Sequence, residues 1–107
     1  MTTAIADAFS RTQVELESYW DHALGEMETH TKQSLNQILE ILREFVKRAK
    51  TLFALTDVKL EFDTLVAEIF QSLHALNETY GGGLLETDER EIIVPLFDDV
   101  ARRLALT

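Results

Sequence analysis

The chain has 107 residues, a hydrophobic share of 46%, a formal net charge of −9 and no cysteine. A chain of this length and composition forms one domain, residues 1–107, with a packed core, which excludes an intrinsically disordered protein. The negative charge argues against binding to nucleic acid or to anionic membrane surfaces, and the missing cysteine excludes disulfides and thiolate chemistry.

Four segments carry apolar residues at steps of three and four, the spacing that places them on one face of a helix. The predicted helices cover residues 4–25, 32–55, 58–80 and 88–105. Amphipathic helices of this length, joined by short connections, predict an all-α protein folded as an antiparallel up-and-down four-helix bundle.

The first predicted helix is expected to be capped by Thr3 and to end at Gly25. The apolar rhythm continues beyond Gly25, so a first helix merged with the second is the alternative. A merged helix over residues 4–55 would be ~75 Å long, which is too long for a compact domain of this size. Two separate helices are therefore preferred.

The second predicted helix is the basic part of an acidic chain. Residues 32–56 carry five basic and two acidic side chains, whereas residues 1–31 carry one and six, and residues 57–107 carry four and eleven. This distribution predicts that the second helix complements acidic neighbours within the bundle. Wide apolar stripes on the second and third helices leave a dimeric bundle as an alternative assembly.

Polar residues and glycines predict the remaining boundaries. Thr56 and Asp57 are expected to separate the second helix from the third, and the run 81–83 of three glycines is expected to end the third. Thr87 is the expected cap of the fourth helix. Pro95 is expected to kink that helix without dividing it, because the apolar face continues on both sides.

The best metal-binding candidate is the set His22, Glu26 and His30, which are spaced by four residues along one helix face. The two histidines would be two turns apart, ~12 Å along the helix axis, which is too far to bind one ion without a break. No second set of ligands is visible, and no Glu has a His three residues after it, as di-iron bundles require. A solvated polar face is therefore favoured, and no metal or cofactor is predicted.

Catalytic groups are not apparent in the sequence. His74 lies beside apolar residues but off the main stripe, which is typical of a boundary residue rather than a general base. The glycine run follows a helix instead of a strand, so it does not fit a phosphate-binding loop. No serine lies in a strained-turn motif. The chain is therefore not expected to be an enzyme.

Trp20 is the candidate anchor for a partner protein. If Tyr19 faces the core, Trp20 lies about 100° further round the helix and would be partly exposed, next to Asp21 and Glu17. A partly exposed Trp with an acidic rim fits a contact surface. The alternative is that Trp20 packs at the rim of its own bundle.

These features predict a small acidic, non-catalytic interaction module that binds or inhibits a basic protein partner, as a toxin-neutralising or adaptor protein would. The first alternative is an oligomeric structural protein such as a homodimer. The second is a bundle that binds a metal or a small ligand. No signal peptide or membrane span is predicted at the sequence level, so the expected location is the cytoplasm.

Overall fold

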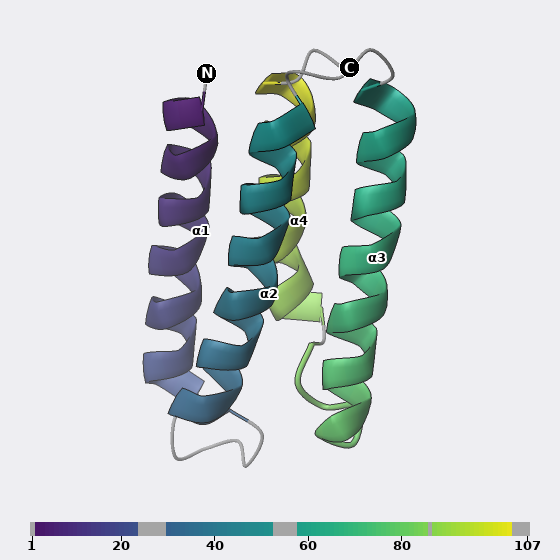
Figure 1. Ribbon diagram of the computed structural model, residues 1–107. Helices are drawn as coiled ribbons and strands as arrows, with labels where there is room; N and C mark the ends of the chain where they lie inside the picture. The colour runs from purple at the N-terminus through teal and green to yellow at the C-terminus, as the bar shows by residue number, and fades with distance from the viewer. Residues whose placement is uncertain (1, 24–29, 53–57, 86, 104–107) are drawn as a thin grey trace.

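The computed structural model describes residues 2–23, 30–52, 58–85 and 87–103. It contains the helices α1 (Thr2–Ala23), α2 (Lys32–Thr51), α3 (Val58–Thr79) and α4 (Thr87–Arg103), and the described residues contain no strand. Successive helices run in opposite directions, with α1 and α3 at opposite edges of the bundle (Figure 1). The prediction of an all-α up-and-down four-helix bundle is confirmed.

The helix boundaries lie within a few residues of the predicted ones, and the largest difference is that α2 ends at Thr51 with Leu52 as its C-cap, instead of at residue 55. Two expected caps also differ. Thr3 is inside α1, which begins at Thr2, so Thr3 is not its cap. Thr87 is the first residue of α4 rather than the residue before it. The expected roles of Gly25, Thr56 and Asp57 fall outside the described residues.

The alternative of one merged helix is wrong, because α2 has a start of its own. Thr31 is extended, with φ −116° and ψ 168°, and its side chain accepts a hydrogen bond from the Ser34 backbone at 3.2 Å. The Ser34 hydroxyl accepts in return from the Thr31 backbone at 2.9 Å. This capping box satisfies two N–H groups that a helix start leaves unpaired. It lets α2 reverse direction and pack against α1.

The core is built around Phe45 of α2. Its ring centroid lies 6.1 Å from that of Phe62 on α3 and 4.6 Å from that of Phe97 on α4. Ile5, Leu16, Leu42 and Val100 are also fully buried. Burial of one such side chain contributes about 1.5–3 kcal/mol, so this shared core is what holds the four helices together.

The contacts between helices are unequal around the bundle. α1 packs closely against both α2 and α4, and α2 also packs closely against α3. Between α3 and α4 lies a pocket with a volume of about 460 Å³. The α3–α4 side is therefore the open side of the bundle.

The glycine run after α3 ends this helix, as predicted. Gly81 and Gly82 have φ values of 76° and 85°, in the left-handed region. The Gly82 backbone donates to the Asn77 carbonyl at 2.9 Å, and the Gly81 backbone donates to the Glu78 carbonyl at 3.0 Å. These two bonds form a Schellman motif, which satisfies the last carbonyl groups of the helix.

Two other sequence-based expectations can be compared with the fold. α4 continues through Pro95 as one helix, as predicted. Arg48 of basic α2 pairs with Glu68 of α3 at 2.5 Å, which agrees with charge complementarity within the bundle. Both side chains are more than 40% exposed, so this ion pair contributes little to stability.

Among the described residues, every helix is too short or too polar to span a membrane.

Candidate functional site

The three metal-binding candidates are not brought together by the described structure. His22 is exposed on α1, where its Nδ1 lies 2.9 Å from the Ser18 carbonyl of its own helix. His30 is buried, which corrects the expectation that it belongs to a solvated polar face. Glu26 lies outside the described residues. Within the described part of the chain, no three His, Asp or Glu side chains are grouped as metal ligands.

Trp20 is only 2% exposed, so the expected partial exposure is wrong. Its indole N–H donates to the Ser34 hydroxyl at 3.2 Å, across the contact between α1 and α2. A buried Trp cannot contact a partner surface, and the proposed anchor role loses its basis. Asp21 and Glu17 are exposed on α1, as expected.

Trp20 instead belongs to a buried polar cluster, which we define as Trp20, His30, Ser34 and Glu89. The Trp20 and His30 ring centroids are 4.4 Å apart, and His30 Nε2 lies 2.7 Å from Glu89 Oε1. The side chains of His30 and Glu89 are 0% and 1% exposed. The cluster joins α1, α2 and α4 at the end of the bundle where α2 and α4 begin.

Chemically, the buried polar cluster resembles part of an acid–base site, since it pairs an imidazole with a carboxylate. Its members are at most 2% exposed, so a substrate could not reach them in this structure. All fully buried side-chain nitrogens and oxygens of the described residues have hydrogen-bond partners. We therefore assign the cluster a structural role in holding the helices together.

An acidic groove runs between α2 and α3. We define it by its carboxylates Glu40, Glu44 and Glu68 and by the apolar side chains Ile41 and Leu76. Its volume is about 560 Å³, and it is shallow. Arg48 is the only basic residue among those that line it, so the charge of the groove is negative.

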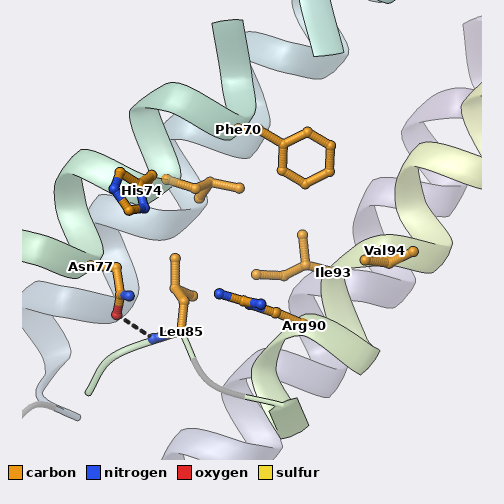
Figure 2. A pocket seen from close by; sticks show the side chains of 8 residues that line it. Phe70, His74, Asn77, Leu85, Arg90, Ile93 and Val94 are labelled. Atoms are coloured by element: carbon orange, nitrogen blue, oxygen red, sulfur yellow. Dashed lines mark hydrogen bonds between the residues drawn. The ribbon is translucent and has the colours of Figure 1, made fainter. Parts of the chain in front are cut away.

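An apolar pocket lies between α3 and α4, and Figure 2 shows its side chains. Five of the eight lining residues are apolar, and they are Phe70, Leu73, Leu85, Ile93 and Val94. The polar lining residues are His74 and Asn77 on α3 and Arg90 on α4. This pocket combines an apolar wall with three hydrogen-bonding side chains, an arrangement typical of small-molecule sites.

The chain matches no protein-family model, and comparisons with curated proteins and with solved structures give no significant match. The functional interpretation therefore depends on the geometry of the two surface sites. Each site combines residues from two helices that follow each other in the chain, α2 and α3 for the acidic groove and α3 and α4 for the apolar pocket. Periodicity predicted His74 to be a boundary residue, but it could not show which α4 side chains lie opposite.

Proposed function

We propose that this chain is a non-catalytic interaction module that binds a basic segment of a partner protein. The acidic groove is the observation that carries this proposal. Its walls place Glu40 and Glu44 on α2 opposite Glu68 on α3, above an apolar floor. A groove of this kind fits an amphipathic helix whose apolar face is flanked by Lys or Arg.

Glu68 pairs with Arg48, but the other two carboxylates of the groove have no opposite charge paired with them among the described residues. Glu40 and Glu44 are exposed, and neither forms an ion pair with another described residue. They are four residues apart on one helix, where like charges destabilise the helix by about 0.2–0.5 kcal/mol. A basic ligand would relieve this repulsion. The groove thus supports a role in binding more than a role in stability.

The net charge of −9 supports the same partner chemistry. Long-range attraction to a basic protein speeds association and weakens as salt screens the charges. A second copy of the chain would bring the same negative charge to this surface. A basic partner is therefore a better occupant of the groove than a second copy.

The test compares two variants with equal charge changes. Glu40→Lys with Glu44→Lys alters the groove, and Asp7→Lys with Asp98→Lys alters α1 and α4 away from it. Each pair removes two negative and adds two positive charges, so both variants change from −9 to −5. Each immobilised variant is used to capture proteins from the native host at low and at high salt.

We expect the unchanged chain and the control variant to enrich a basic protein at low salt and to release it at high salt. The groove variant should lose it. The same partner is then synthesised as a peptide, and its binding is measured by fluorescence anisotropy. Equal binding by both variants would show that the partner binds outside the acidic groove. If the unchanged chain enriches no basic protein at low salt, the proposal as a whole is contradicted.

A further inference from the structure

We infer that the pocket between α3 and α4 is a binding site for a small apolar carboxylate. Asn77 and Arg90 hold the carboxylate, and Phe70, Ile93 and Val94 cover the apolar part of the ligand. This site lies on a different side of the bundle from the acidic groove. The inference is therefore independent of the proposed function.

The side chain of Asn77 indicates that the ligand carries a hydrogen-bond acceptor. This side chain is 9% exposed, and its Oδ1 accepts hydrogen bonds from the Leu84 and Leu85 backbones at 2.9 and 2.8 Å. Since the oxygen faces these two N–H groups, as Figure 2 shows for Leu85, the other end of the amide is the NH₂ group. That group forms no hydrogen bond with a described residue. The group is not sealed from solvent, since no fully buried side-chain nitrogen of the described residues lacks a partner. A ligand oxygen at this wall can therefore replace water as its acceptor.

Arg90 supplies the positive charge. Its side chain extends from the first turns of α4 into the space between Leu85 and Ile93, on the opposite side of the pocket from His74 (Figure 2). It forms no ion pair with a described residue, although the chain has 19 acidic residues. A guanidinium group binds a carboxylate through two parallel N–H donors. Arg90 and Asn77 together thus favour a planar anion.

His74 lies at the edge of this arrangement. Its Nε2 is 3.7 Å from Glu78 Oε1, which is too long for a hydrogen bond but brings a carboxylate close to the ring. Glu78 is not among the residues that line the pocket. A bound anion is therefore better placed toward Asn77 and Arg90 than toward His74.

The apolar wall explains why the ligand must be amphiphilic. Phe70 and Val94 are 46% and 41% exposed, and the Phe70 ring stacks on Phe97 at 4.9 Å. Contact with a ligand would remove this apolar surface from water. From Phe70 to Asn77 the α3 wall is about 10 Å long, which is short for a docked helix but sufficient for a small molecule. The volume of about 460 Å³ is also typical of small-ligand pockets.

The test uses decanoate, below the concentration at which it forms micelles, with the intact chain. Binding is measured by calorimetry, and its position by NMR from the shifts of the Asn77 side-chain NH₂ and the Arg90 side-chain N–H. Acetate tests the head group alone, decan-1-ol tests the tail without charge, and decyltrimethylammonium tests the tail with the opposite charge. We expect decanoate to bind at least about tenfold more tightly than each of these three compounds.

Two variants test the residues that hold the carboxylate. Asn77→Asp keeps an acceptor for the Leu84 and Leu85 backbones but replaces the NH₂ donor by an oxygen. Arg90→Gln removes the guanidinium from an exposed side chain and should not affect folding. Arg103→Gln, at the end of α4 and outside the pocket, is the matched control.

Both pocket variants should weaken decanoate binding by about tenfold or more, whereas Arg103→Gln should not change it. Circular dichroism first confirms that each variant is folded. If Asn77→Asp does not fold, Arg90→Gln alone decides the outcome. Equal binding of decanoate and decan-1-ol, no binding, unchanged affinity in Arg90→Gln, or NMR shifts confined to residues away from the pocket would each overturn the inference.

Discussion

His30 and Glu89 form a hydrogen bond of 2.7 Å between side chains that are 59 positions apart in the sequence. His30 immediately precedes Thr31, the N-cap of α2, and Glu89 is in the first turn of α4. Since almost no solvent reaches either side chain, the pair fixes these two helix starts relative to each other. Removing either side chain of the pair should lower the stability of the bundle, because a buried polar group that loses its partner is costly.

Glu89→Ala should therefore reduce the free energy of unfolding by about 3 kcal/mol or more. Replacing the pair by apolar residues, His30→Phe with Glu89→Leu, should leave stability within about 2 kcal/mol of the unchanged chain, because neither member of the pair is then left buried opposite a missing partner. Urea denaturation followed by circular dichroism measures both values. A double variant less stable than Glu89→Ala would contradict this expectation.

Ser34→Ala tests the link between the capping box and Trp20. The substitution removes the acceptor for the Trp20 indole N–H and for the Thr31 backbone. We expect a loss of about 1–3 kcal/mol in the free energy of unfolding. Ser10→Ala, on the exposed face of α1, is the control and should have little effect.

Because Trp20 is the only tryptophan, its fluorescence also tests its burial directly. In the folded chain, acrylamide should quench this fluorescence weakly, and urea should make it fully accessible. Strong quenching in the folded state would place Trp20 at the surface and restore it as a candidate contact residue.

Most of the fold could be predicted because helix periodicity identifies the face that each helix must bury. Ile5, Leu16, Ile38, Leu42 and Leu65 are all buried, as their spacing requires. The start of α2 at residue 32 was also predicted, but the capping box that fixes it was not. Ser34 has no apolar signal, and its role depends on Thr31 adopting an extended conformation.

The buried contacts at the end of the bundle where α2 and α4 begin could not be predicted from the sequence. Periodicity within one helix indicates which face is buried but not what covers the helix end. Trp20 lies outside the predicted stripe of α1, yet His30, from the segment before α2, packs against its ring. In the sequence, Glu89 is only an acidic residue near a helix start, where it complements the helix dipole. Neither residue carries a local signal of the distant partner that buries it.

The two surface sites were missed for a related reason. Asn77 and Arg90 have no motif in common, and they line one pocket only because α3 and α4 run side by side in the folded chain. Glu40 and Glu44 could be seen as a like-charged pair, but the opposing Glu68 could not. Sites of this kind require the spatial order of the helices.

Gly82→Ala tests the turn after α3. Gly82 has a φ of 85°, and an added Cβ would have no atom within 4 Å, so only the backbone conformation opposes the substitution. We expect a loss of about 1–2 kcal/mol in the free energy of unfolding. Gly82→Asn should cost less, because Asn adopts the left-handed conformation more readily. Equal stability of Gly82→Ala and the unchanged chain would contradict the left-handed turn.

Pro95→Ala should stabilise the chain. Pro95 is exposed within α4, where proline is about 3 kcal/mol less favourable than alanine and leaves the Glu91 carbonyl without its usual helical donor. Because the bundle has adapted to proline, we expect a smaller gain of about 1–3 kcal/mol in the free energy of unfolding, measured by urea denaturation. Glu91→Ala, at an exposed position of the same helix, should change stability by less than about 0.5 kcal/mol. If Pro95→Ala destabilises the chain instead, the local geometry that proline imposes on α4 is needed for its packing against α1.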